Sequence, residues 1–309
     1  MALRGSGGDG GVRELVEKAA GEAVESVQRV GSSGWSSQAT YTLESGRRLF
    51  VKTSGESADG MFAGEAASLR AMRHAALQAP DGAPALVIPD VLHYGPTLDA
   101  EGMPALRGSL IVMDHLNLGA RGSQGELGEA LARMHAAEPL APEAAAGQYG
   151  FPMDNTIGGT PQPNGWMDDW VAFFAERRLR HQCRLARDPE LSKLGDLVAK
   201  RLPELMEGAE LRPATLHGDL WSGNIGGVGG SPSVFDPATY YGHAEAEFGM
   251  SWCAGFGPDF YAGYFGVLPK QPGHDQRATL YEAYHYLNHF NLFGGSYYSG
   301  AVDRLRRLA

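Results

Sequence analysis

The strongest constraint on the fold lies in residues 215–238, where polar side chains alternate with short apolar segments. His217-Gly218-Asp219-Leu220-Trp221-Ser222-Gly223-Asn224 follows Thr215-Leu216 and precedes Ile225, and Asp236-Pro237-Ala238 comes next. The apolar flanks predict a strand, a tight loop and a second strand, with the polar side chains projecting from the loop. Gly218 and Gly223 permit the sharp backbone that such a loop needs. The sequence therefore predicts a hairpin that presents Asp219, Asn224 and Asp236 together.

These three polar residues match the groups that kinase-type phosphoryl transfer uses. We expect the carboxylate of Asp219 to orient and deprotonate the hydroxyl that attacks ATP. The amide oxygen of Asn224 and the carboxylate of Asp236 are expected to hold Mg²⁺ against the phosphates. The alternative is a turn whose His, Asp and Asn side chains only satisfy local backbone groups. The spacing of Asn224 and Asp236 from Asp219 favours phosphoryl transfer over that alternative.

Lys52 and Glu65 are candidates for binding the phosphates of ATP. Lys52 ends the strand-like run Leu49-Phe50-Val51, where a lysine could also point to solvent. Glu65 lies on the apolar side of the next predicted helix, where an unpaired carboxylate would be costly. This mutual requirement favours an ion pair in which Glu65 steadies Lys52.

Other candidate site residues rest on weaker signals. Gly31 and Gly34 belong to the segment Gly31–Ser37, whose small residues would let backbone N–H groups approach phosphate oxygens. The segment lacks both G-x-G-x-x-G and the P-loop pattern, so it could be an ordinary turn. Asp114-His115-Leu116 follows an apolar strand, where the backbone could bind the adenine edge of ATP. We also assign Trp221, as a wall of the pocket, and His217 to the substrate side of the site.

The distribution of apolar residues predicts an α+β fold of two lobes. Residues 1–113 should form a small β-rich N-lobe, 114–119 a hinge, and 120–309 a larger helical C-lobe. In the N-lobe we predict helices over 12–30 and 61–72, a hairpin of 40–43 with 49–52, and strands near 90–94 and 109–113. In the C-lobe we predict helices from a capping box at Ser123, and over 169–187, 190–206, 245–255 and 276–293.

Composition excludes several classes of function. The formal net charge of −10 argues against nucleic acid or an anionic membrane as the main partner. No run of about 18 apolar residues exists that could span a membrane. Cys183 and Cys253 form no disulfide or zinc pattern and are expected to be buried. We expect a soluble intracellular protein, cytoplasmic or, if a transit peptide has been trimmed, plastidic.

Several blocks of sequence are similar to the fructosamine-3-kinase / ketosamine-3-kinase family over nearly the whole chain. The blocks are Phe50-Val51-Lys52, Met61-Phe62-x-x-Glu65-Ala66, Asn164-x-Trp166-x-Asp168-Asp169-Trp170, Leu216–Asn224, Asp236-Pro237-Ala238-x-Tyr240-Tyr241-Gly242-His243-x-Glu245 and Tyr286-Leu287-Asn288-His289. Residues 154–158 and 248–253 look most like plant and algal members. The resemblance implies a protein-kinase-like fold that uses ATP and Mg²⁺ to phosphorylate the 3-hydroxyl of ketosamines, such as fructosamine or ribulosamine, on glycated lysines.

The resemblance carries further expectations. The unstable 3-phosphate would release the amine, so the activity would be protein deglycation, a form of repair. Substrates would be glycated proteins, peptides and free ketoamines, and the chain would be a monomer or weak homodimer. One departure is that Trp35 stands where many members carry a cysteine in the Gly-rich loop, so thiol regulation at this loop is not expected. Two other functions stay open: a small-molecule kinase of the aminoglycoside or choline type, and an ATP-binding pseudokinase.

Overall fold

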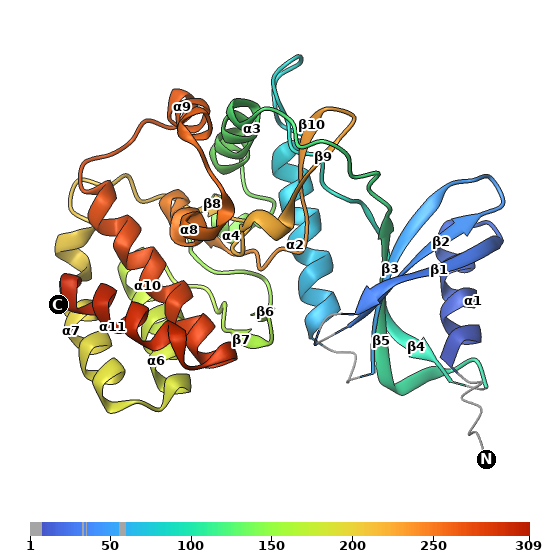
Figure 1. The fold of residues 1–309 in the computed structure, drawn as a ribbon, viewed down its shortest axis with the longest axis horizontal. Coiled ribbons are helices and arrows are strands. Elements are labelled where there is room, and N and C mark those ends of the chain that lie inside the picture. Colours follow the sequence, from blue (N-terminus) through green and yellow to red (C-terminus); the bar gives the residue numbers. More distant parts are fainter. Residues whose placement is uncertain (1–7, 33, 35, 56–59, 100) are drawn as a thin grey trace. The chain divides into compact units, whose positions relative to one another are not determined.

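The chain divides into two compact units. The computed structural model describes residues 8–32, 34, 36–55, 60–99 and 101–309 (Figure 1). One unit comprises Met1–Arg70 and Pro89–Asn117, and the other comprises Ala71–Ile88 and Leu118–Ala309. The division near residue 117 falls inside the predicted hinge, whereas residues 71–88, which we assigned to the N-lobe, cluster with the second unit. None of the helices in the described ranges is long and apolar enough to cross a membrane.

The first unit is built on an antiparallel sheet of five strands in the order β1-β2-β3-β5-β4. The strands are β1 (Val24–Ser32), β2 (Ser37–Leu43), β3 (Arg48–Ser54), β4 (Val91–Leu98) and β5 (Pro104–Asp114). The predicted hairpin is present as the antiparallel pair of β2 and β3. Gly46 adopts a φ of 83° in the turn between them, a conformation that favours glycine. Helix α1 (Gly8–Ala20) covers one face of the sheet, where Val16 joins Leu49, Val51 and Val112 in a buried core.

The predicted helix over residues 12–30 is wrong in its second half, which forms β1. Helix α1 ends because Gly21 adopts a left-handed φ of 70° and donates its N–H to the carbonyl of Glu17 at 2.8 Å. Valines at 24, 27 and 30 fit a helical stripe, but pairing with β2 places Val27 opposite Tyr41. Tertiary pairing therefore overrides the local pattern. The predicted Gly- and Ser-rich segment 31–37 consequently includes the end of β1 and the start of β2; Trp35, singled out above, lies outside the described residues.

Helix α2 (Met61–Ala76) begins in the first unit and confirms the predicted helix. Its residues Phe62, Ala66 and Leu69 are buried. Along β3, Leu49 and Val51 belong to the core beneath α1, so Lys52 projects from the opposite face, because successive side chains of a strand alternate. Glu65 of α2 meets Lys52 on that face.

The second unit is mainly helical. Its helices are α3 (Gln124–Ala136), α4 (Pro142–Ala145), α5 (Trp170–Phe173), a π-helical turn η1 (Phe174–Leu179), α6 (Arg180–Ala186), α7 (Pro189–Leu205), the 3₁₀ turns η2 (Ser222–Asn224) and η3 (Ala244–Met250), α8 (Ser251–Ala254), α9 (Pro258–Val267), α10 (His274–Phe293) and α11 (Ser296–Leu308). Ser123 and Asp169 cap α3 and α5 by accepting backbone N–H groups, as their predicted positions at helix starts require.

Short two-stranded antiparallel sheets interrupt these helices. They pair β6 (Asn155–Ile157) with β7 (Thr160–Gln162), β8 (Ala214–Thr215) with β11 (Tyr241–Gly242), and β9 (Ile225–Val228) with β10 (Ser231–Val234). The predicted strand, loop and strand around Asp219 are therefore β8 and β9, separated by η2. Cys183 is buried as expected, whereas Cys253 is only half-buried. That expectation fails because Cys253 lies in α8, a single turn whose Trp252 is also partly exposed.

Candidate active site

The loop that carries Asp219 is anchored to the chain that follows Asp236. Beyond the pairing of β8 with β11, the N–H of Leu216 bonds to the carbonyl of Tyr240 at 3.2 Å, and the N–H of Ala238 bonds to the carbonyl of His217 at 2.9 Å. Gly218 adopts a φ of 81°, and a Cβ built on it would lie 2.2 Å from the carbonyl oxygen of Ala238. Only glycine fits this crossing of the two segments.

The amide of Asn224 links the backbone of Asp219 to that of Asp236, the other predicted metal-binding residue. Its Nδ2 donates to the carbonyl of Asp219 at 2.9 Å and to the carbonyl of Asp236 at 3.3 Å. Because Nδ2 is committed to these carbonyls, the amide oxygen faces away from them and can act as a ligand. Asp236 holds a left-handed φ of 58°, which is uncommon for a residue other than glycine. An amide oxygen and a carboxylate are donors that suit Mg²⁺, so the residues present fit this metal.

The catalytic-loop backbone is held by Glu247, a buried carboxylate of η3. Its Oε2 accepts the N–H of His217 at 2.6 Å and its Oε1 accepts the N–H of Gly218 at 2.9 Å. Nε2 of His135 on α3 lies 3.0 Å from the same carboxylate. Burial acts to raise the pKa of Glu247, but the hydrogen bond and charge of His135 and the groups at His217 outweigh it, so the pKa is lowered. Glu247 is thus held as a carboxylate that fixes the two residues before Asp219.

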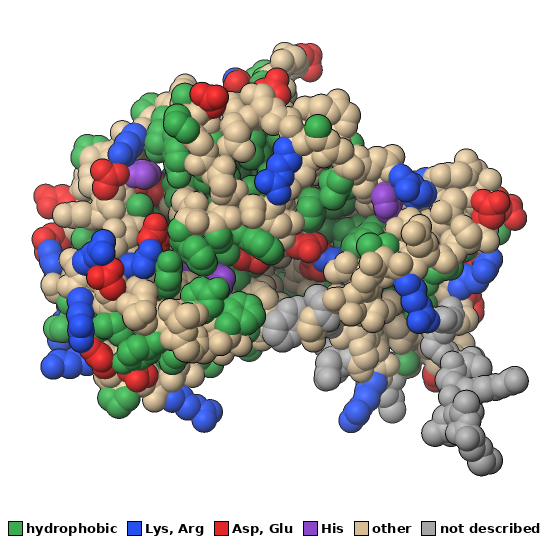
Figure 2. Space-filling view, viewed as in Figure 1, with side chains coloured by type: hydrophobic (Ala, Val, Ile, Leu, Met, Phe, Trp, Pro, Cys, Tyr) green, Lys and Arg blue, Asp and Glu red, His purple; other side chains and the backbone are tan. Residues whose placement is uncertain are grey.

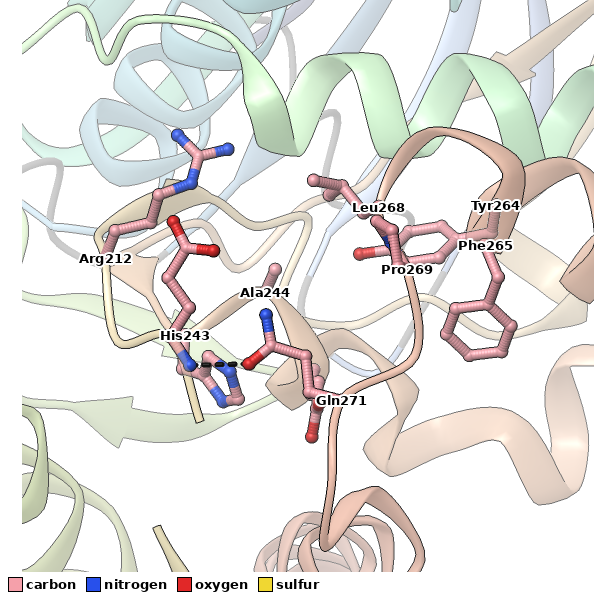
Figure 3. Close-up of a pocket in the computed structure, with 10 residues that line it drawn as sticks. Arg212, His243, Ala244, Tyr264, Phe265, Leu268, Pro269 and Gln271 are labelled. Atoms are coloured by element: carbon pink, nitrogen blue, oxygen red, sulfur yellow. Dashed lines mark hydrogen bonds between the residues drawn. The ribbon is translucent and has the colours of Figure 1, made fainter. Parts of the chain in front are cut away.

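His135 continues this network to Tyr264. The Nδ1 of His135 lies 2.8 Å from the Tyr264 hydroxyl. Tyr264 also lines a small pocket of about 50 Å³ together with Arg212, His243 and Gln271 (Figure 3). The pocket holds none of the predicted site residues, so we regard Tyr264 as part of the support of the loop.

Both ring nitrogens of His217 form hydrogen bonds with the backbone. It is fully buried, its Nε2 donates to the carbonyl of Phe235 at 2.9 Å, and its Nδ1 accepts the N–H of Asp219 at 3.2 Å. Burial lowers its pKa, in keeping with a neutral ring that donates from one nitrogen and accepts at the other. This geometry fits support of Asp219 better than the substrate contact that we expected from sequence.

The environment of Asp219 raises the pKa of its carboxyl to about 7. Burial is the largest cause, followed by the negative charges of Asp236 and Glu247. A carboxyl with a pKa near neutrality can take up a proton from a reacting hydroxyl and release it again near pH 7. Among carboxyls, such a shift is typical of a general base.

A second network of amide side chains holds the backbone just after Asp236. Nε2 of Gln162 donates to the carbonyl of Ala238 at 3.0 Å, and Nδ2 of Asn155 donates to the carbonyl of Thr239 at 2.8 Å. Asn155 in turn accepts from Asn164, whose own oxygen accepts from the fully buried guanidinium of Arg178 at 2.7 Å. Because Arg178 can only donate, it fixes the orientation of the amides in this series.

In the first unit, Lys52 and Glu65 form an ion pair. Nζ of Lys52 lies 2.7 Å from Oε1 of Glu65, and their side chains are only 7% and 11% exposed. The two side chains therefore have the contact expected from sequence, and both are largely withdrawn from water. Asp219, Asn224 and Asp236 all belong to the second unit.

Part of the backbone at the predicted hinge already forms hydrogen bonds within the chain. The N–H of Asp114 donates to the carbonyl of Asp90 at 2.9 Å, and the N–H of His115 donates to the carbonyl of Arg48 at 3.3 Å. Asp114 also pairs through its side chain with Arg47. Gly31 pairs with Gln38 one position before the end of β1, and Gly34 lies in the bend before β2. A Cβ at either glycine would meet no described atom within 4 Å, so local crowding does not require glycine there.

Trp221 is 41% exposed and directly follows Asp219 and Leu220. A Cβ built on Gly223 would lie 2.4 Å from the Trp221 ring, so the indole rests over the backbone at that glycine. Its position is therefore defined although it is open to solvent.

Sequence reasoning missed Glu247, His135 and the amide network. One signal was available for Glu247: Glu245 and Glu247 stand in the apolar stretch 244–250, where carboxylates require partners. Glu245 finds its partner in Arg277, with oxygen–nitrogen distances of 2.7 and 2.9 Å. Besides His135, the partners of Glu247 are the backbone N–H groups of His217 and Gly218, and no residue type marks such groups.

Comparison with known proteins shows what the chain is similar to. The family model described as fructosamine kinase matches residues 11–309. A chloroplastic protein-ribulosamine 3-kinase of Oryza sativa subsp. indica is 43% identical over 296 residues, 92% of this chain and 80% of that protein. A crystal structure from Thermobifida fusca, assigned as a fructosamine-3-kinase, has a TM-score of 0.80 at 27% identity, covering 97% of this chain and 99% of the other.

A more distant likeness concerns the fold alone. The aminoglycoside phosphotransferase APH(4)-Ia, in a ternary complex with AMP-PNP and hygromycin B, has a TM-score of 0.57 at 16% identity and covers 96% of this chain and 97% of the other. Together with the antiparallel sheet of the first unit and the helices of the second, these likenesses establish a protein-kinase-like α+β fold.

Proposed function

The chain belongs to the fructosamine kinase family, and from this premise we propose that it transfers the γ-phosphoryl group of ATP to the 3-hydroxyl of ketosamines on glycated lysines. The observation that carries the proposal is the catalytic loop itself. The pKa of the Asp219 carboxyl is raised to about 7. The amide of Asn224 links the backbone of Asp219 to that of Asp236. The enzyme is therefore a phosphotransferase with an alcohol acceptor.

In this reaction Asp219 binds the sugar hydroxyl and accepts its proton. The hydroxyl oxygen forms a bond to the γ-phosphorus while the bond from that phosphorus to the ADP oxygen breaks. Glu247 and His217 hold the backbone on either side of Gly218, so the Asp219 carboxylate keeps one position during the transfer. Asn224 and Asp236 would hold Mg²⁺, which neutralises phosphate charge when bound.

We assign the remaining predicted residues to the nucleotide and the sugar. Lys52, oriented by Glu65, would bind the α- and β-phosphates. Of the predicted hinge residues, Leu116 is the best candidate to donate an N–H to adenine, because the N–H groups of Asp114 and His115 already bond to carbonyls. Gly31 and Gly34 would contribute backbone N–H groups near the phosphates. Trp221 would form a wall for the sugar, while His217 acts as a positioning residue.

Two alternatives fit less well. A kinase for aminoglycosides or choline would share the fold, but the family model covers nearly the whole chain, while the likeness to APH(4)-Ia is limited to 16% identity. A pseudokinase would be expected to lose a metal ligand or the base, and Asp219, Asn224 and Asp236 are all present.

A substrate panel separates these possibilities. The purified protein should consume ATP with ribulosyl-lysine, fructosyl-lysine and glycated peptides, and show little turnover with choline, kanamycin or a serine-containing peptide. Turnover with an aminoglycoside and none with any ketoamine would overturn the substrate assignment. ATP binding without turnover on any acceptor would indicate a pseudokinase.

The rice relative is chloroplastic by name, which favours a plastid over the cytoplasm for this chain. Expression of the full-length gene product with a C-terminal fluorescent tag tests this. Fluorescence confined to the cytoplasm would contradict it.

A further inference from the structure

A cluster of aromatic side chains lies at the surface of the second unit. It consists of Trp252 from α8, Tyr286, His289 and Phe293 from α10, and Tyr297 from α11, and we call it the aromatic surface. The ring centroids of Trp252 and His289 are 5.5 Å apart, those of His289 and Tyr297 are 4.9 Å apart, and those of Phe293 and Tyr297 are 6.1 Å apart. The rings therefore form one continuous group. Hydrophobic side chains gather over this part of the unit in the space-filling view (Figure 2).

The aromatic surface is partly exposed to solvent, and Arg304 packs against one of its rings. Phe293 is 63% exposed, Trp252 is 38% exposed, and the other three rings are half-buried. The guanidinium of Arg304 lies 3.7 Å from the centre of the Tyr286 ring and is itself bound by Glu282 at 2.7 Å. Single exposed aromatic residues are common, whereas a contiguous group of them is a candidate for binding a partner.

The aromatic surface adjoins the catalytic loop. Helix α8, which carries Trp252, contacts η2, the turn that begins after Trp221. After burial, the charge of Asp219 is the next cause that raises the pKa of the Cys253 thiol, so the residue beside Trp252 lies within electrostatic reach of the catalytic carboxylate. The end of the aromatic surface that α8 carries therefore lies next to the loop of Asp219.

We propose that the aromatic surface binds the polypeptide that carries the glycated lysine, so that the enzyme prefers glycated peptides and proteins to free ketoamines. The inference rests on the proposed function. With the sugar at Asp219, a lysine side chain of about 6 Å, estimated from its bond lengths, keeps the peptide backbone close to the loop. Aromatic rings pack against backbone and aliphatic groups without selecting one sequence, which suits a repair enzyme that meets many proteins.

The test compares a ketoamine with and without its polypeptide. Wild type, Phe293→Ser and Trp252→Ala are assayed with ribulosyl-lysine and with an eleven-residue peptide carrying one ribulosyl-lysine. The measured quantity is the ratio of kcat/KM for the peptide to kcat/KM for the free amino acid. A general loss of folded or active enzyme lowers both constants and leaves this ratio unchanged. Leu197→Ser, at a 40% exposed position on α7 outside the aromatic surface, is the matched control.

We expect the wild-type ratio to exceed one, and to fall at least about fivefold in each aromatic-surface variant through KM for the peptide, but not in Leu197→Ser. An unchanged ratio in both variants would overturn the inference while leaving the kinase activity established. The main alternative is that a second copy of the chain covers the aromatic surface, and gel filtration tests this. If wild type is a dimer, Phe293→Ser dissociates it and the ratio stays unchanged, the surface is a dimer interface. Failure of wild type on every ketoamine would overturn the proposed function, and this inference with it.

Discussion

Replacing Glu247 by glutamine should loosen the backbone that carries Asp219. The carboxylate accepts three hydrogen bonds, from the N–H groups of His217 and Gly218 and from His135. A glutamine has one oxygen and one NH₂ group, so in either orientation the NH₂ faces a backbone N–H that donates in the wild type. Leaving one buried donor unsatisfied and weakening the charged bonds should cost about 2–4 kcal/mol of unfolding free energy.

The catalytic consequence of Glu247→Gln should appear in kcat. Glu247 is buried and bonded to the backbone before Asp219, so we expect it to act on the rate through the position of Asp219. A shift of about 1 Å in a positioned group costs up to roughly 10²-fold, so kcat should fall about 10- to 100-fold with little change in KM for ATP. The negative charge of Glu247 also helps to raise the pKa of Asp219, after burial and Asp236. Its removal should therefore move the acid limb of the pH–rate profile to lower pH.

The stability difference should depend on pH with a defined sign. The pKa of Glu247 is lowered in the folded protein from its ordinary value of 4.5, so its contribution is fully present above about that pH. It is lost as pH falls through the lowered value, and the melting temperatures of wild type and Glu247→Gln should converge in acid. Differential scanning fluorimetry from pH 3 to 8 measures this.

An exposed carboxylate provides the control for the Glu247 variant. Glu207→Gln, at an exposed position after α7, should match wild type in melting temperature and kcat. If Glu247→Gln unfolds at the wild-type temperature at pH 7 and keeps its kcat, these hydrogen bonds do not hold the catalytic loop.

Three further predictions concern the residues assigned to chemistry. Asp219→Asn should fold and bind MgATP, yet lose about 10²–10⁴-fold in kcat; retention of more than about a third would exclude it as the base. Asn224→Ala and Asp236→Ala should raise the Mg²⁺ concentration needed for half-maximal rate, Asp236 more because it carries charge, and identical Mg²⁺ titrations would refute both roles. Lys52→Met should raise KM for ATP and Glu65→Gln should do so less; a double-mutant cycle should be non-additive, and strict additivity would show that they do not cooperate.

Local spacing predicted that Asp219, Asn224 and Asp236 lie together. Asp219 and Asn224 come before β9 and Asp236 comes after β10, so the hairpin of β9 and β10 brings them close to one another. Lys52 and Glu65 were paired from sequence because each occupies a position where its charge needs a partner, and the structure places them in contact. The helices predicted over 61–72 and 276–293 likewise follow from their own periodicity, and the structure has them at 61–76 and 274–293.

The features that sequence did not predict depend on distant contacts. Strand β1 carries valines at helical spacing, and only its pairing with β2 distinguishes it from a helix. Glu247 bonds to backbone groups about thirty positions earlier in the chain, which carry no residue-type signal. His217 was assigned to the substrate side from sequence, and its ring hydrogen-bonds to the backbone of Phe235 and Asp219, contacts that the sequence did not predict. Such support of a site becomes visible only with coordinates.

The position of the transferred phosphate tests the central claim most directly. Wild type and Asp219→Asn are each incubated with MgATP and ribulosyl-lysine labelled with ¹³C at the third sugar carbon, and ³¹P and ¹³C spectra are followed over time. We predict a phosphate coupled to that carbon in the wild-type reaction, followed by release of free lysine and inorganic phosphate, and no such signal with Asp219→Asn. Phosphate on another carbon, or an equal yield from Asp219→Asn, would contradict the account.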